Sequence, residues 1–299
     1  MAPSQIDLHA AYGGVVPEIA GGMLLQDPHS GRILAIQGGF DAGLNSFNRA
    51  TQAMRQPGSS FKPFVYMAAL LKGYTPEDKV VDGPVAVGNW APKNYSNKYK
   101  GRTTLTDALA HSYNSIPVKL MIDIGRTAII DTAHLAGIKG QLETWAPMVL
   151  GPSTLSLMDL TTGYISFASG GLAAKPYTVL EIRRSNGDVL YLRGTEGTMP
   201  PRRVFPEEKV AELNSMMSAV VKSGTGRRAD LVVVHAASRK IEACEAVCEE
   251  MRALGVRARQ QHGTRQAGGL CVEINPDRTD LSALVEVHLA GRALDVLPK

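Results

Sequence analysis

The chain has 299 residues, of which 44% are hydrophobic, so it is long enough to bury the core of one large domain or two modest ones. Its 32 Lys and Arg against 28 Asp and Glu leave a formal net charge of only +4, which argues against the strongly basic surface of a nucleic-acid-binding protein. Because the mean hydropathy is -0.06 and no run approaches 18 apolar residues, we expect no membrane span. The first seven residues contain neither a basic nor an apolar segment, so we expect no signal peptide.

The first predicted elements are a hairpin and a helix. A hairpin between residues 23–26 and 32–36 is predicted because Pro and Gly supply the turn that separates them. Residues 64–72 favour a helix, and Pro63 must lie in its first turn, where helix N–H groups have no intrahelical partner. Ser59 is therefore expected at or next to the N-terminus of this helix.

A series of shorter helices and a second hairpin is predicted further along the chain. Residues 104–107 have capping-box-like spacing and open a short helix that is predicted to end near His111. A polar stretch then interrupts the helical pattern, which places Ser112 and Asn114 on a helix-to-helix connection. The remaining predicted elements are a helix over 155–167, a hairpin over 179–191 and a helix over 206–222. Strands, then helices, then strands predict an α+β fold.

Ser59 and Lys62 form a Ser-x-x-Lys pair at the start of the first predicted helix. A spacing of three residues puts the hydroxyl and the amine on one helix face, within hydrogen-bonding reach. A serine is a poor nucleophile unless a base takes its proton, and burial near a helix N-terminus favours the neutral amine that can act as this base. By itself, however, the pattern is more often ordinary helix capping than catalysis.

A second motif, Ser112-x-Asn114, lies on the predicted connection between helices. Its hydroxyl can relay protons, and its amide can hold a substrate carbonyl or the lysine. Alone, this motif is an ordinary turn sequence. Together with Ser59 and Lys62 at this separation, it matches the serine acyltransferase pattern of penicillin-recognising enzymes.

The stretch from Phe47 to Phe64 resembles the active-site region of the transpeptidase domain in class A penicillin-binding proteins of the 1A type. Further matches run in the family's order between about residues 16 and 231, at 27–32, 90–95, 160–164, 168–171 and 222–229. The resemblance implies the α+β fold shared by penicillin-binding protein transpeptidases and serine β-lactamases, in which a central antiparallel sheet lies beside a mostly helical lobe.

The same resemblance implies that the protein is a peptidoglycan D,D-transpeptidase, which cross-links stem peptides through a serine acyl-enzyme and is acylated by β-lactam antibiotics. The implied roles are nucleophile for Ser59, general base for Lys62, proton relay for Ser112, substrate-orienting amide for Asn114, and substrate binding for Trp90 and Asn94. Neither a cofactor nor a metal is implied, because acyl transfer needs only the serine, its base and an oxyanion site.

The family's third motif, Lys-Thr-Gly, is missing from the sequence. It is expected soon after residues 224–229, on an edge strand that recognises the substrate carboxylate and supplies an oxyanion N–H. Residues 222–224 have suitable residue types at a helix end, and residues 262–264 have the small residues in the wrong order. The alternative function is therefore a catalytically inactive remnant or a module that binds peptidoglycan or β-lactams.

The sequence beyond residue 231 differs in composition from the rest. All six Phe, both Trp and all nine Tyr lie at or before Phe205, whereas the three cysteines follow it. Cys244 and Cys248 lie four residues apart on a predicted helix, and core packing is a better interpretation than metal binding because no Cys-x-x-Cys pair is present. Strands at 232–234 and 256–259 on either side of that helix give a βαβ-like pattern.

Three segments are expected: a lead-in at 1–15, an incomplete transpeptidase domain at 16–231, and an atypical tail at 232–299. The tail has three explanations, namely a frameshifted translation, a fusion or a divergent C-terminus, and the abrupt change favours the first. Family members carry an N-terminal membrane anchor and a glycosyltransferase domain that this sequence lacks. We therefore expect a fragment or truncated product of a protein that acts at the periplasmic face of the bacterial inner membrane.

Overall fold

The computed structural model describes residues 20–39, 46–193 and 201–229, together with three strands of the C-terminal part. The chain divides into two compact units, Met1–Met217 and Ser218–Lys299. Among the helices that the structure describes, none combines the length and the apolar character that crossing a membrane requires.

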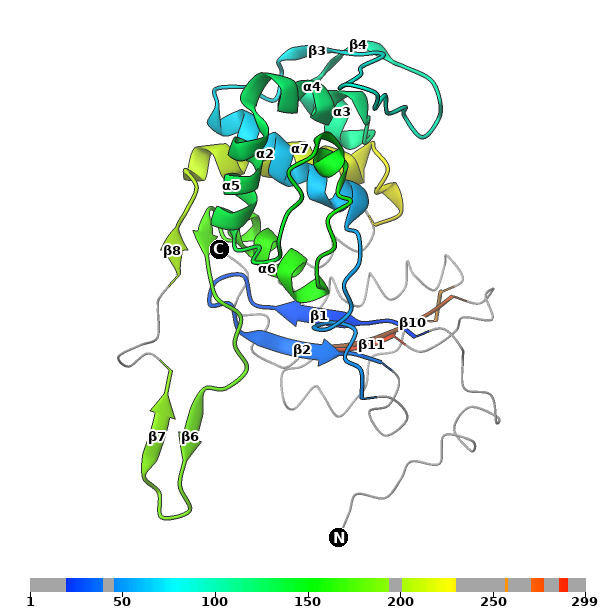
Figure 1. Ribbon diagram of the computed structural model, residues 1–299. Helices are drawn as coiled ribbons and strands as arrows, with labels where there is room; N and C mark the ends of the chain where they lie inside the picture. The colour runs from blue at the N-terminus through cyan, green and yellow to red at the C-terminus, as the bar shows by residue number, and fades with distance from the viewer. Residues whose placement is uncertain are drawn as a thin grey trace. The chain divides into compact units, whose positions relative to one another are not determined.

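A hairpin opens the described part of the first unit, as predicted. Its strands, β1 (Met23–Gln26) and β2 (Ile33–Gln37), pair in antiparallel register (Figure 1). Gly31 in the turn has φ of +80°, and a Cβ atom at this position would lie 2.5 Å from the carbonyl oxygen of Lys175. The main chain of Tyr177 also bonds to this hairpin, accepting from the Ile33 N–H at 2.7 Å. The turn therefore depends on a close approach by a distant segment.

The central helix of the first unit is α2 (Lys62–Leu71). All of its residues from Lys62 to Leu70 are buried, as expected for a helix that is apolar on nearly every side. It contacts α4 (Ser115–Ile124) and α5 (Arg126–Ala136), and Figure 1 shows it surrounded by other helices. The ring of Phe64 packs edge-on against Tyr164 of α6 (Leu157–Ala168), with centroids 5.6 Å apart.

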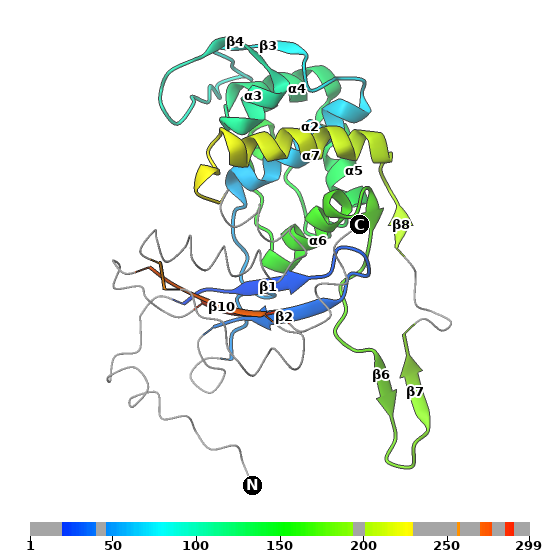
Figure 2. The same ribbon diagram turned by 180° about the vertical axis from the view of Figure 1, so that it is seen from behind.

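Short strands and helical turns connect these helices. They are η1 (Gly58–Phe61), β3 (Lys79–Asp82), β4 (Gly101–Thr104), α3 (Leu105–Ala110), η2 (Ala146–Leu150), β5 (Leu172–Ala173), β6 (Glu181–Arg183), β7 (Val189–Leu192) and β8 (Arg202–Arg203). The pairs β3–β4, β5–β8 and β6–β7 are all antiparallel. The β6–β7 hairpin confirms the prediction for residues 179–191 and projects away from the helices (Figures 1 and 2).

Local capping signals set two of the predicted helix boundaries. Thr104 is the N-cap of α3, its hydroxyl accepts the Asp107 N–H at 3.0 Å, and the helix ends at the C-cap His111.

The last predicted helix is α7 (Glu207–Lys222), which runs across the boundary between the two units. Its buried residues in the first unit, Val210, Leu213 and Met216, lie three apart on one face. The α+β fold class is confirmed.

In the second unit the structure describes η3 (Arg227–Ala229), β9 (Val256–Arg257), β10 (Leu270–Pro276) and β11 (Val285–Leu289). Strand β10 pairs antiparallel with both of the others, in the order β11-β10-β9. Strand β9 overlaps the strand predicted at 256–259. The lead-in 1–15, the strand predicted at 232–234 and the cysteine-bearing helix at 238–254 lie outside the described residues, so the βαβ-like pattern and the segment boundaries stay predictions.

Candidate active site

Ser59 lies on η1, a single turn of 3₁₀ helix that leads directly into α2. This confirms its predicted place next to the helix N-terminus, with Pro63 in the first turn of α2. A main-chain hydrogen bond holds this turn in place, because the Gly58 N–H donates to the carbonyl of Gly151 at 3.1 Å. Gly151 has φ of +73°, and a Cβ atom there would lie 2.2 Å from the Gly58 oxygen. The Ser59 side chain itself is exposed.

Lys62 is a buried cation, with only 1% of its surface exposed. Its Nζ donates to Ser112 Oγ at 2.9 Å, to the Ser112 carbonyl at 2.7 Å and to Asn114 Oδ1 at 2.8 Å, and the Tyr113 carbonyl lies at 3.4 Å. Burial lowers the pKa of Lys62 from 10.5 to about 8, because a desolvated ammonium is disfavoured relative to the neutral amine. A sizeable fraction of this amine is therefore neutral near physiological pH.

Ser112 bridges the lysine and the serine. Its Oγ lies 2.9 Å from Lys62 Nζ and donates to Ser59 Oγ at 3.0 Å. Its backbone has φ of +56°, a conformation that costs a residue other than glycine about 1–3 kcal/mol and is concentrated at functional sites. The connection between α3 and α4 thus holds this hydroxyl in a strained position that faces Ser59.

The lysine and serine do not meet directly, although their spacing predicts that they do. Within residues 46–193 the structure gives Lys62 no hydrogen bond to Ser59, and their link passes through Ser112. The reason is local: Ser59 lies on the 3₁₀ turn before α2, while the lysine amine is drawn to the oxygens of residues 112–114. The structure therefore brings together Ser59, Lys62, Ser112 and Asn114 in one connected cluster.

Asn114 is the N-cap of α4, and its side-chain oxygen, side-chain nitrogen and main-chain N–H each have a partner. Its Oδ1 accepts from Lys62, its Nδ2 donates to the Lys93 carbonyl at 2.8 Å, and its main-chain N–H donates to Asn94 Oδ1 at 2.7 Å. The stretch at 90–95, singled out in the sequence, therefore lies directly against the Ser112-x-Asn114 motif.

The two residues expected to bind substrate lie in different surroundings. Asn94 is only 5% exposed, and its Nδ2 donates to both carboxylate oxygens of Asp82, at 3.0 and 2.9 Å, and to the Lys98 carbonyl at 3.0 Å. Trp90 is half-buried, its main chain pairs with that of Val87, and no hydrogen bond joins it to the Ser59 cluster within residues 46–193. Sequence reasoning missed Asp82, whose only signal was an acidic residue after two valines.

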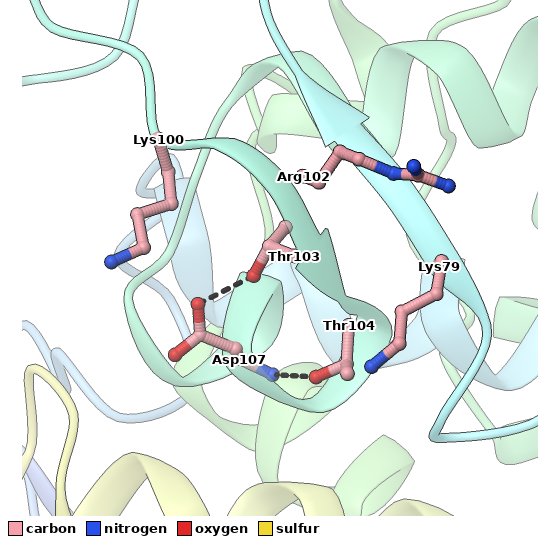
Figure 3. A pocket seen from close by; sticks show the side chains of 6 residues that line it. All are labelled: Lys79, Lys100, Arg102, Thr103, Thr104 and Asp107. Carbon is pink, nitrogen blue, oxygen red and sulfur yellow. Dashed lines mark hydrogen bonds between the residues drawn. The ribbon is translucent and has the colours of Figure 1, made fainter.

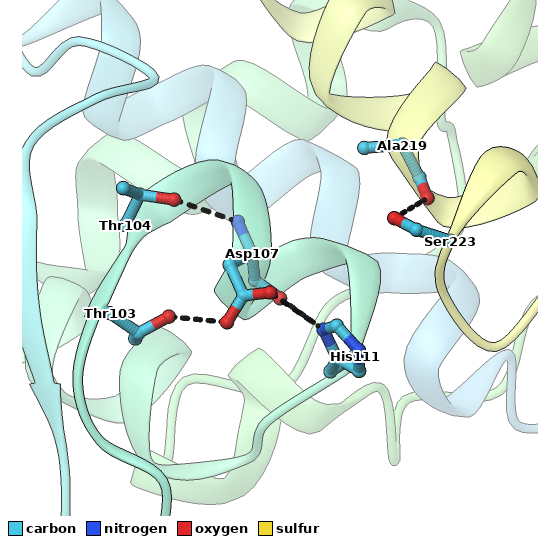
Figure 4. A network of polar contacts seen from close by, with 6 residues as sticks. All are labelled: Thr103, Thr104, Asp107, His111, Ala219 and Ser223. Carbon is cyan, nitrogen blue, oxygen red and sulfur yellow. Dashed lines mark hydrogen bonds and ion pairs between the residues drawn. The ribbon is translucent and has the colours of Figure 1, made fainter.

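A separate hollow of about 540 Å³ lies over β3, β4 and the start of α3 (Figure 3). Its lining residues are Lys79, Lys100, Arg102, Thr103, Thr104 and Asp107. The Asp107 carboxylate accepts from Thr103 Oγ1 at 2.5 Å and lies 3.0 Å from His111 Nδ1, as Figure 4 shows. Because this hollow contains no residue of the Ser59 cluster, it is distinct from the candidate catalytic centre.

The comparison with protein families agrees with this geometry. Residues 21–242 match the family model of the penicillin binding protein transpeptidase domain. The chain belongs to this transpeptidase family. The matched range includes Ser59, Lys62, Ser112 and Asn114, and the resemblance to class A penicillin-binding proteins is confirmed.

Curated relatives named penicillin-binding protein 1A are similar over most of this chain. The Rickettsia typhi protein is 32% identical over 236 residues, which cover 71% of this chain and 30% of that protein. The Aquifex aeolicus protein is 34% identical over 224 residues, covering 73% of this chain and 30% of that protein. The chain therefore spans less than a third of the length of these transpeptidase-family relatives.

Solved structures show the same fold. Penicillin-binding protein 1A from Haemophilus influenzae matches with a TM-score of 0.66 over 88% of this chain and 42% of its own, and at 22% identity this match shows the fold alone. PonA1 from Mycobacterium tuberculosis, solved in complex with penicillin V, matches with a TM-score of 0.62 and 27% identity over 72% of this chain and 59% of its own.

Proposed function

We propose that the chain is a peptidoglycan D,D-transpeptidase, which cross-links stem peptides through an acyl-enzyme on Ser59. One observation carries the proposal: a buried lysine of lowered pKa is connected to Ser59 Oγ by the hydroxyl of Ser112, over steps of 2.9 and 3.0 Å. Such a chain of groups gives a serine the base that it needs as a nucleophile.

Proton transfer along this chain depends on the charge of Lys62. With Nζ protonated, the hydrogen bonds run from Lys62 to Ser112 and from Ser112 to Ser59. When Nζ is neutral, the same groups can reverse, so that Ser59 donates to Ser112 and Ser112 donates to Lys62. A pKa of about 8 leaves about one tenth of the amine neutral at pH 7, which is about 300-fold more than a pKa of 10.5 allows.

The proposed reaction follows from this reversal. Ser59 Oγ attacks the carbonyl of the D-Ala-D-Ala bond and transfers its proton through Ser112 to Lys62. The C–N bond then breaks, and the departing D-Ala takes a proton back through Ser112, which leaves an ester on Ser59. An amine from a neighbouring stem peptide takes the acyl group in the second half, and a β-lactam acylates Ser59 by opening of its ring amide. Stem peptides and β-lactams are the proposed partners, and the periplasmic face of the inner membrane is the proposed location.

The missing Lys-Thr-Gly sequence supports a second candidate function. Without this motif, which in the family recognises the substrate carboxylate, the domain would bind peptidoglycan or β-lactams without forming an acyl-enzyme, or would be an inactive remnant.

Covalent labelling by a fluorescent penicillin distinguishes the two. We expect a stable label on the purified chain, loss of that label in Ser59→Ala, and retention of the label in the control Ser60→Ala. Ser60 is a suitable control because its side chain, next to that of Ser59, is also exposed, and its described contacts are made by the main chain: its carbonyl accepts from Tyr164 Oη at 2.7 Å and its N–H donates to the Pro57 carbonyl at 3.2 Å. A folded wild-type chain that takes no covalent label would establish the inactive alternative.

A further inference from the structure

A buried carboxylate, Asp82, lies behind the connection that carries Ser112 and Asn114. It is 1% exposed, and its position at the end of β3 is fixed by pairing with Gly101 of β4. Besides the two contacts from Asn94, it accepts from Ser115 Oγ at 2.5 Å and from the main-chain N–H of Lys100 at 2.7 Å. These contacts use the four acceptor sites of a carboxylate.

The partners of Asp82 are all neutral donors. In the described part of the chain no Lys, Arg or His forms an ion pair with it. Its charge acts on the phenol of Tyr66, since burial and then the nearby Asp82 raise the pKa of that group. The lowered pKa of Lys62 has burial as its cause. The hydrogen bonds of Asp82 therefore connect it to the lysine through the positions of other groups.

Asn94 connects Asp82 to the segment between α3 and α4 that carries Ser112 and Asn114. Because both protons of its Nδ2 are directed to Asp82 and the Lys98 carbonyl, its Oδ1 is held toward the Asn114 N–H. Asp82 itself holds the next residue, Ser115. Two consecutive residues at the start of α4 are thus fixed to one carboxylate, and the side chain of Asn114 lies 2.8 Å from Lys62 Nζ.

Resting on the proposed acyl transfer, we propose that Asp82 and Asn94 are positioning residues that hold Asn114 Oδ1 against the amine of Lys62. This role replaces the expectation that Asn94 contacts substrate. Its Nδ2 and Oδ1 are already engaged within the protein, and the residue is nearly inaccessible.

A double-mutant cycle on the full 299-residue chain tests the proposal. The rate constant of labelling by fluorescent penicillin is measured at pH 9, where most of Lys62 is neutral, for Asn94→Ala, Asn114→Ala and the double variant. We expect Asn94→Ala to label about 10- to 100-fold more slowly than wild type, the loss typical of a displaced catalytic group. In the Asn114→Ala background, the same change is expected to add nothing. Equal losses in both backgrounds, or a wild-type rate in Asn94→Ala, would overturn the proposal.

The control is Ser96→Ala, in the same loop, whose side chain is exposed and whose Oγ makes only a 3.5 Å contact with the Lys98 carbonyl and a 3.3 Å contact with the Lys98 N–H. It is expected to label at the wild-type rate. If Asn94→Ala does not fold, Ser115→Ala takes its place, since it removes only the direct contact with Asp82. We expect about threefold slower labelling from this milder change, and an unchanged rate would overturn the proposal.

A second measurement does not depend on acylation. The titration of Lys62 is followed by the NMR shift of its Cε carbon. Loss of the Asn114 acceptor disfavours the ammonium, so the midpoint is expected to fall in both Asn114→Ala and Asn94→Ala. A midpoint that falls only in Asn114→Ala would refute the positioning role. A wild-type chain that takes no label but shows both shifts would instead refute the proposed function and leave the positioning role in place.

Discussion

The protonation of Lys62 should control the rate at which Ser59 is acylated. The perturbation is pH, and the relevant quantity is the neutral fraction of a buried amine whose pKa is about 8. This fraction is about 1% at pH 6 and about 90% at pH 9. The rate constant for penicillin labelling is therefore expected to rise tenfold per pH unit up to about pH 8 and then level off, an increase of about 90-fold between pH 6 and 9.

Labelling is measured with a penicillin whose carboxylate stays ionised throughout this range, and circular dichroism at each pH confirms that the chain is folded. A flat profile between pH 6 and 9 would refute the assignment of Lys62 as the base. A rise that continues without levelling toward pH 10.5 would show that burial does not lower the pKa of this amine.

The same lowered pKa affects stability. The unfolded chain keeps the Lys62 proton up to about pH 10.5, whereas the folded chain releases it near pH 8, so the unfolded state binds more protons between these values. The free energy of unfolding is expected to rise across this window by about 3 kcal/mol. Lys62→Met, which has a similar shape and no charge, is the control: urea unfolding of this variant should lack the rise, and an equal rise in both proteins would contradict the reasoning.

Two further predictions concern the backbone around the site. Thr104→Ala removes the N-cap of α3 and is expected to lower the free energy of urea unfolding by about 1 kcal/mol, whereas Thr104→Ser keeps the hydroxyl and should cost less; equal losses would count against a capping role. Gly151→Ala is expected to cost about 2 kcal/mol or more and to slow penicillin labelling, because its Cβ would meet the Gly58 oxygen beside Ser59. Gly170→Ala is the control: Gly170 has a nearly equal φ of +71°, but a Cβ atom there would meet no atom within 4 Å, so this change introduces backbone strain without a steric clash. Equal effects of the two changes on labelling would contradict the role given to the clash with Gly58.

Much of the fold could be predicted because its signals are local. Pro63 fixed the start of α2, the Thr104 hydroxyl marked the start of α3, and the Pro-Gly turn separated β1 from β2. Each of these depends on dihedral angles or caps within a few residues, which the sequence carries directly.

The site was predicted in its residues but not in its connections. Ser59, Lys62, Ser112 and Asn114 could be found because two short motifs at a given separation match a known family. The hydrogen-bonded route from Lys62 to Ser59 through Ser112 could not be predicted from the sequence, since it depends on the 3₁₀ turn at Ser59 and on a positive φ at Ser112.

The sequence by itself therefore determined the fold class, the family and the four residues of the cluster. Tertiary structure decided the state of Lys62 and the role of its neighbours, because burial sets the pKa of an amine and hydrogen bonds join groups that are far apart in the chain. Asn94 illustrates this: its partners Asp82 and Asn114 lie 12 and 20 residues away, and only folding shows that its amide is engaged between them.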